Sequence, residues 1–129
     1  MTLVNFNNKL PLVIVPVSIK LDTVVFDFNF AIDTGASISL IDMDVLRAIG
    51  FQEEFAIRTI QTMTASRQEK AYEFELPNIK AIGLIRRNFK VISRSLPSGL
   101  GIDGLLGLNF FKNKELVIDF KSSEVRLSE

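Results

Sequence analysis

The chain has 129 residues, no cysteine, no histidine, and 15 acidic against 15 basic residues. Its length is that of one ordinary domain. Without Cys and His it lacks disulfides, thiol nucleophiles, Ser–His catalytic pairs and the usual zinc sites. Zero formal net charge gives no support for nucleic acid as a partner, and no apolar run is long enough to cross a bilayer. Any hydrolytic chemistry therefore falls to carboxylates.

The first predicted elements are two strands. Residues 12–20 are the first, and Pro16 places that strand at a sheet edge or a bulge. In the second, Val24–Ile32, apolar residues occupy every even position. This period of two predicts that the even positions face the core. Asp33 follows in the odd phase, so we expect it on the more polar face, where the strand breaks at Gly35.

Short strands are also predicted through the rest of the chain, with two brief helices. The first helix is expected at 43–49, with Asp42 as its N-cap and Gly50 at its end. The second helix is expected at 108–113. The remaining strands are expected at 37–41, 56–64, 71–76, 79–85, 89–93, 116–120 and 125–127, with turns at 77–78, 86–88 and 122–123. Many short strands at close spacing favour an all-β, barrel-like domain.

Two motifs carry the functional information. The pentapeptide Asp33-Thr34-Gly35-Ala36-Ser37 lies between apolar segments, and Gly104-Leu105-Leu106-Gly107 follows near the C-terminus. Together they make the chain resemble the retropepsin-like aspartic peptidases, the single-domain relatives of pepsin, from about residue 12 to residue 127. The resemblance implies one domain over residues 1–129. It also implies a closed, all-β retropepsin-like barrel with one or two short helices.

The resemblance further implies a homodimer, because members with one Asp-Thr-Gly per chain build their site from two subunits. Asp33 of each subunit would form a catalytic dyad that activates water against a peptide bond. The substrate would be a polypeptide bound in extended form. The mechanism needs no metal and no organic cofactor.

The residues around Asp33 receive supporting roles from the same resemblance. Thr34 would hydrogen-bond across the dimer, and Gly35 would permit the sharp turn and the approach of substrate. Ala36 would leave the cleft open, and Ser37 would contact the substrate backbone. The Gly104-Leu105-Leu106-Gly107 segment would pack behind this loop.

A polar hairpin tip in the middle of the chain corresponds to the flap of this family, with Thr64, Ala65 and Ser66 as the expected flap residues. Family flaps often carry glycine at the tip, whereas this chain has Ser66-Arg67-Gln68-Glu69. This departure leaves an alternative open: a non-catalytic peptide-binding or dimerisation module on the same fold.

Three other motif matches are rejected on sequence grounds. Residues 99–104 match Gly-x-Gly-x-x-Gly but lack the strand and helix of a dinucleotide site. Asp42 and Asp44 are spaced as in a haloacid-dehalogenase loop, but the chain is too short and too β-rich for that fold. Residues 33–44 have the span of a calcium loop without its ligand spacing.

Two expectations concern the setting of the protein. The dimer contact is expected to use the active-site loops and the strands near the termini. The apolar side chains of those strands are Leu3, Val4, Phe6, Val125 and Leu127. The sequence shows no secretory signal pattern, and it has no cysteine. We therefore expect a cytoplasmic protein.

Overall fold

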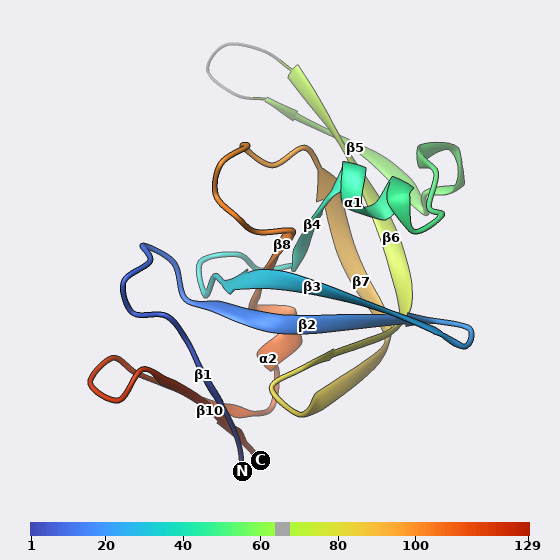
Figure 1. Cartoon of the computed structure of the whole chain (residues 1–129). Coiled ribbons are helices and arrows are strands. Elements are labelled where there is room, and N and C mark those ends of the chain that lie inside the picture. Colours follow the sequence, from blue (N-terminus) through green and yellow to red (C-terminus); the bar gives the residue numbers. More distant parts are fainter. Residues whose placement is uncertain (64–67) are drawn as a thin grey trace.

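A computed structural model describes residues 1–63 and 68–129, and strands dominate it (Figure 1). The strands are β1 (Thr2–Asn5), β2 (Ile14–Leu21), β3 (Val24–Ile32), β4 (Leu40–Asp42), β5 (Arg58–Met63), β6 (Gln68–Ala81), β7 (Leu84–Arg94), β8 (Gly104–Leu106), β9 (Glu115–Asp119) and β10 (Glu124–Ser128). The helices are α1 (Met43–Ala48), α2 (Leu108–Phe111) and a 3-10 turn, η1 (Glu53–Phe55).

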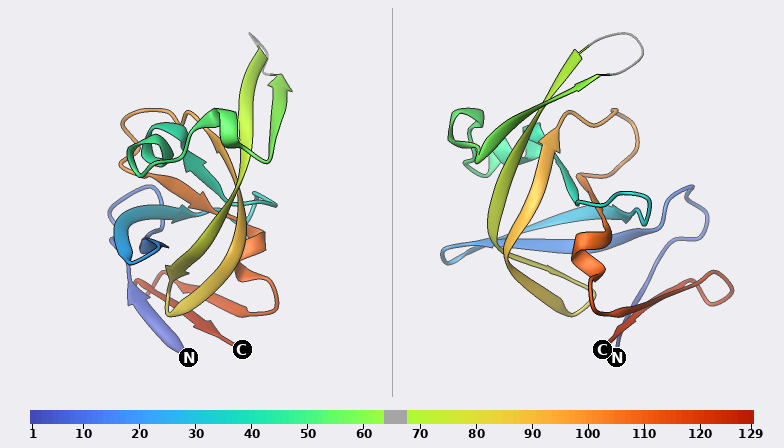
Figure 2. Two further views of the ribbon diagram at one scale, coloured as in Figure 1. Left: turned by 90° about the vertical axis from the view of Figure 1, so that its right-hand side faces the viewer. Right: turned by 180° about the vertical axis from the view of Figure 1, so that it is seen from behind.

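The main sheet closes on itself. Its strand order is β2-β3-β8-β4-β7-β6-β5, and β2 also pairs with β6. Six of these strands therefore form a closed barrel, and β5 extends outward from β6 as the partner in a long hairpin (Figures 1 and 2). The predicted all-β barrel with short helices is confirmed.

The alternating pattern of the early strands produces the barrel interior. Val15, Val17 and Ile19 on β2 are buried, as is Phe30 on β3. Asp27 on β3 faces outward and is exposed. Because side chains alternate between the two faces of a strand, this phase also sets the direction of the residue that follows Ile32.

The turns predicted at 77–78 and 86–88 are wrong. β6 runs through Pro77, and the chain reverses at Ile82 and Gly83, whose φ angles of 51° and 73° suit a two-residue hairpin turn. The β6–β7 pairing passes from Leu76–Phe89 to Asn78–Arg87 and omits Pro77. Proline has no N–H to donate to the ladder, and the pairing is interrupted only locally, next to Asn88 with its φ of 50°.

Asp42 lies at the predicted N-cap position of the first helix, but the prediction that its side chain caps the helix is wrong. Asp42 precedes α1, but its side chain makes no capping hydrogen bond. Instead, Asp42 Oδ1 accepts the backbone N–H of Leu96 at 3.2 Å. The carboxylate thereby fastens the loop between β7 and β8 to the start of α1, and Gly50, at φ 108°, lies just beyond the helix.

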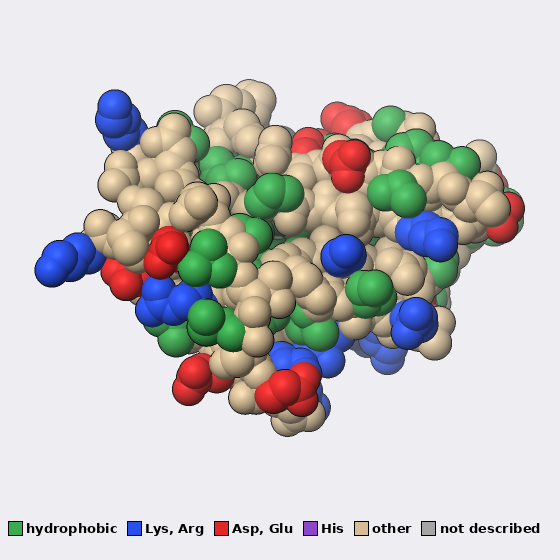
Figure 3. Space-filling view, turned by 60° about the horizontal axis from the view of Figure 1, so that its bottom comes forward, with side chains coloured by type: hydrophobic (Ala, Val, Ile, Leu, Met, Phe, Trp, Pro, Cys, Tyr) green, Lys and Arg blue, Asp and Glu red, His purple; other side chains and the backbone are tan. Residues whose placement is uncertain are grey.

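The two ends of the chain form a second, three-stranded sheet in the order β1-β10-β9, at the bottom of Figure 1. Phe6, Val125 and Leu127 are buried within the chain, Val4 is half-buried and Leu3 is exposed. These side chains therefore contribute mainly to the core of their own chain. On the face that includes this sheet, apolar side chains are scattered among charged ones (Figure 3).

A carboxylate holds the turn between β9 and β10. Asp119 Oδ1 accepts the backbone N–H groups of Ser122 at 3.1 Å and Lys121 at 2.9 Å. Hydrogen bonds from Ser122, then that from Lys121 and the charge of Arg126, hold the pKa of Asp119 below its usual 3.8. Because the folded state favours the ionised form, this stabilisation is present above pH 3.8 and is lost as pH falls through the lower folded pKa.

We therefore expect Asp119→Asn to unfold at a lower temperature than the wild type at pH 7. The asparagine keeps an acceptor oxygen for the turn N–H groups, but it loses the negative charge and the second oxygen that faces Arg126. The difference in melting temperature should shrink when both proteins are measured near pH 3. A difference that stays constant between these two pH values would contradict this account of the turn.

Candidate active site

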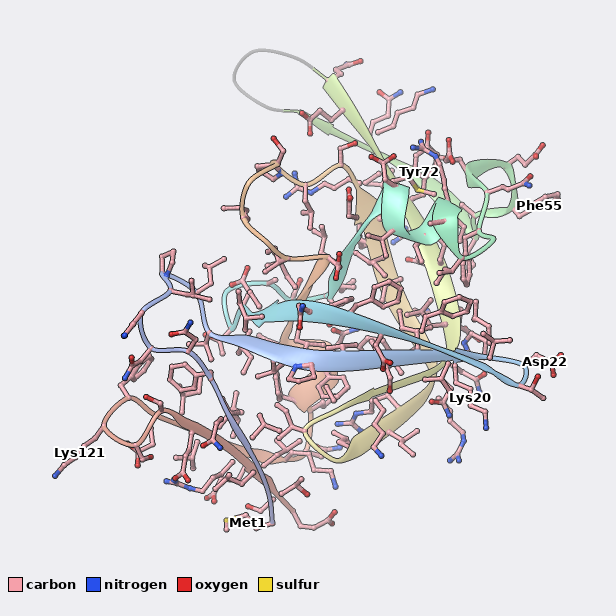
Figure 4. All side chains as sticks on the ribbon, in the orientation of Figure 1. Met1, Lys20, Asp22, Phe55, Tyr72 and Lys121 are labelled. Carbon is pink, nitrogen blue, oxygen red and sulfur yellow. The ribbon has the colours of Figure 1, made fainter. Side chains whose placement is uncertain are left out.

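Asp33 lies directly after β3, at the opposite end of that strand from the turn that carries Asp22 (Figure 4). Its backbone N–H donates to the carbonyl oxygen of Leu106 at 2.9 Å, which continues the parallel pairing of β3 with β8. Its side chain is half-buried, and Oδ1 accepts the N–H of Gly35 at 3.0 Å. The end of the strand and the following turn therefore fix the orientation of this carboxylate.

β8 supports the Asp33 loop from behind. It pairs parallel with β3 and antiparallel with β4, so it lies between the strands that precede and follow the loop. A side chain at Gly104 would place its Cβ 2.4 Å from the carbonyl oxygen of Leu40, and one at Gly107 would lie 2.7 Å from that of Ala36. Both glycines are required by close backbone approach. The prediction that 104–107 packs behind the loop is confirmed.

A buried hydrogen-bond group connects the loop to this support. Ser39 is fully buried; its N–H and its hydroxyl both donate to Asn109 Oδ1 at 2.8 Å. The same hydroxyl accepts the N–H of Gly107 at 2.9 Å, and Asn109 Nδ2 donates to the carbonyl oxygen of Lys90 at 2.9 Å. These bonds join the segment after the loop to α2 and β7.

Replacing Asn109 by alanine should destabilise the protein by about 2 to 3 kcal/mol, because two buried donors of Ser39 would lose their acceptor. The loss should appear as a lower urea midpoint with an unchanged slope. Asn8→Ala is a suitable control, because the exposed Asn8 side chain bonds only to Ser123. An Asn109→Ala midpoint equal to that of the control would contradict this role.

The other residues of the pentapeptide lie on the accessible side of the loop. Thr34 and Ser37 are exposed and Ala36 is half-buried. Within residues 1–63 and 68–129, the Thr34 hydroxyl bonds to no other protein group. The Thr34 hydroxyl is thus accessible from outside the chain.

An open groove of about 570 Å³ runs beside the loop. Gly35, Ala36 and Ser37 line one side of it, and side chains of β5, β6 and β7 line the other. The β5–β6 hairpin thus lies across the groove from the loop. The predicted flap residues Thr64, Ala65 and Ser66 lie outside the described residues.

A family model described as aspartyl protease matches residues 15–110, which include the whole Asp33 loop and its support. The chain belongs to the aspartyl protease family. No curated protein matches the chain. The solved structures include a similar fold, that of a retropepsin-like aspartic protease from Rickettsia conorii. The TM-score is 0.68 at 22% identity, over 95% of this chain and 94% of that chain.

Family membership and the fold agree with the retropepsin-like prediction from the motifs. Sequence reasoning nevertheless missed four residues of the site: Ser39, Asn109, Arg58 and Arg94. A polar Ser39 within an apolar run was a usable signal for a buried hydrogen bond. The arginines gave no such signal, because only the fold brings β5 and β7 to the same groove.

The described part of the chain contains neither a metal-binding cluster of acidic side chains nor a membrane-spanning helix. Among the residues that the structure describes, no three Asp or Glu side chains group together in a way that could hold a metal ion. In the same part of the chain, no helix is long and apolar enough to span a membrane.

Proposed function

We propose that this chain is an aspartic endopeptidase that acts as a homodimer. The observation that carries the proposal is the half-buried Asp33 carboxylate, oriented by the Gly35 N–H at 3.0 Å and placed beside an open groove. Only one Asp-Thr-Gly occurs in the chain. A two-fold axis next to the loop would bring Asp33 of both subunits together, as an isologous contact does with any residue near its axis.

The paired carboxylates would share one proton, since two negative charges at hydrogen-bond distance are unfavourable. The ionised carboxylate would accept a proton from a water molecule as that water attacks the peptide carbonyl carbon. The protonated carboxylate would donate to the carbonyl oxygen, and a proton would then pass to the leaving amine. The exposed Thr34 hydroxyl would bond across the axis and hold the two loops together.

The substrate would lie extended in the groove, between the Asp33 loop and the β5–β6 hairpin. An extended peptide can pair with exposed backbone groups, which gives affinity independent of sequence. Closure of the hairpin over the peptide would exclude water from the reacting groups.

The test is cleavage of a diverse peptide mixture by the purified protein from acidic to neutral pH, with its mass in solution measured in parallel. We expect a dimer that cuts peptides, with activity falling on both sides of an optimum because one proton must be shared. A strictly monomeric protein that cuts nothing would remove the basis of the proposal.

A second function is kept because the sequence Ser66-Arg67-Gln68-Glu69 contains no glycine. On this reading the chain binds peptides or dimerises without hydrolysis, since a fold does not guarantee an activity. Peptides that bind equally to wild type and Asp33→Asn, and that the wild type never cleaves, would favour this function.

A further inference from the structure

Two arginines line the groove beside Asp33. Of the residues that line it, Arg58 on β5 and Arg94 on β7 are the charged ones, and all of the lining residues belong to the described part of the chain. The floor between them includes Ile60, Ala71 and Ile92. A ligand in this groove therefore meets an apolar floor with a guanidinium on either side.

The sheet register explains this placement. Arg58 pairs with Glu73, and Glu73 with Ile92, across β5, β6 and β7. Directly paired residues point to the same face of a sheet, so Arg58 and Ile92 lie on one face and both line the groove. Glu73 is only 6% exposed and lies beneath its neighbours, whereas 65% of the Arg58 side chain is exposed.

Both guanidinium groups keep free donors. Arg58 Nε and an Nη both approach the same oxygen of Glu73, at 3.2 and 3.1 Å. The nearest carboxylate oxygen to Arg94 is that of Glu69 at 3.9 Å, which is too long for a hydrogen bond. A guanidinium has five N–H donors, so each group can still bind an incoming carboxylate.

We propose that this groove is a specificity subsite for an acidic side chain of the substrate, with Arg94 as its main anchor and Arg58 as a second. The proposal rests on the proposed peptidase function and deepens it. A glutamate suits the site, because its methylene groups can pack on Ile60 and Ile92 while its carboxylate reaches a guanidinium. Since Gly35, Ala36 and Ser37 also line the groove, the glutamate would occupy a position close to the scissile bond.

The experiment uses peptide pairs that differ only by Glu or Gln at one position near the cleaved bond. For the wild type we expect one position at which kcat/KM is about tenfold higher for the Glu peptide than for the Gln peptide. A factor of this size is typical of a partly exposed charge pair with good geometry. The preference should fall with added salt. It should also fade below about pH 4, where the substrate glutamate becomes protonated.

Arg94→Gln should reduce the Glu/Gln ratio of kcat/KM to near one. Arg58 is tested together with its buried partner as Arg58→Gln/Glu73→Gln, which avoids leaving the Glu73 carboxylate unpaired. Arg87→Gln is the matched control, because Arg87 is exposed on β7 and does not line the groove. The control should keep the wild-type ratio.

The failure of this inference is distinguishable from the failure of the proposed function. Asp33-dependent cleavage with equal rates for Glu and Gln at every position would overturn the acidic subsite and leave the peptidase intact. If no peptide is cleaved, the proposed function fails. In that case, the existence of the acidic subsite is tested by measuring how the same peptide pairs bind to the wild type and to Arg94→Gln. Equal binding of Glu and Gln peptides would overturn it.

Discussion

Replacement of Asp33 by asparagine should abolish peptide cleavage and leave the fold intact. Asparagine has the same shape, and its Oδ1 can still accept the Gly35 N–H that orients the side chain. The substitution removes both the base that activates water and the shared acid, each of which contributes roughly 10²- to 10⁴-fold. We expect kcat/KM to fall by at least about 10⁴-fold, with an unchanged melting temperature, circular dichroism spectrum and mass in solution.

Subunit mixing extends this test to the dimer itself. If each site needs one Asp33 from each chain, an equal mixture of wild type and Asp33→Asn retains about one quarter of the activity after exchange, because mixed dimers are inactive. A site complete within one chain would retain about one half. Asp27→Asn gives a matched control, because Asp27 is exposed on β3 and outside the groove; its mixtures should remain fully active.

Gly107→Ala should destabilise the protein and misplace the Asp33 loop. At φ −94°, the Gly107 backbone is acceptable for alanine, so the cost is purely steric. The new Cβ would lie 2.7 Å from the carbonyl oxygen of Ala36 and 2.9 Å from the carbonyl carbon of Ile38. We expect a loss of about 3 kcal/mol in the free energy of unfolding. The protein that remains folded should show kcat/KM about 100-fold lower, because the carboxylate would shift.

Gly99→Ala separates steric cost from backbone strain. Gly99 has a φ of 86° and open space around its Cβ position, so alanine there should cost about 1 kcal/mol and leave the kcat/KM of the folded protein unchanged. Denaturant titration and initial rates on the two variants provide the comparison. A Gly107→Ala protein as stable and active as Gly99→Ala would contradict the close-packed support of the loop.

Local patterns were sufficient to predict the part of the molecule that carries Asp33. The alternation of residues 24–32 depends only on neighbours in sequence, and it gave both the strand and the phase of Asp33. The motif at 33–37 and the glycines at 104 and 107 then indicated the family. Both glycines lie where the backbone comes too close for a side chain to fit.

The features that sequence reasoning missed depend on pairing between distant segments. Pro77 is normally a turn signal, yet β6 continues past it because the strand is held by β7 on one side and by β2 further along. Aspartate is a favourable N-cap residue, but the Asp42 carboxylate accepts a hydrogen bond from Leu96 in the loop before β8 instead. Arg58 and Arg94 become neighbours of one groove only after three strands have aligned.

The position of β8 between β3 and β4 has a consequence for folding. Residues 104–106 must insert between residues 30–32 and 40–42 before Asp33 acquires its final surroundings. The pairing of β8 with β3 closes a long loop, from Ile32 to Gly104, and this lowers the entropy of the chain before stabilising contacts form. We therefore expect this pairing to form later than the local hairpins. During synthesis, the Asp33 loop therefore lacks its packing against β8 and Gly107 until residue 107 has left the ribosome. The carboxylate is therefore set in place only after β8 has been synthesised and has paired with β3 and β4.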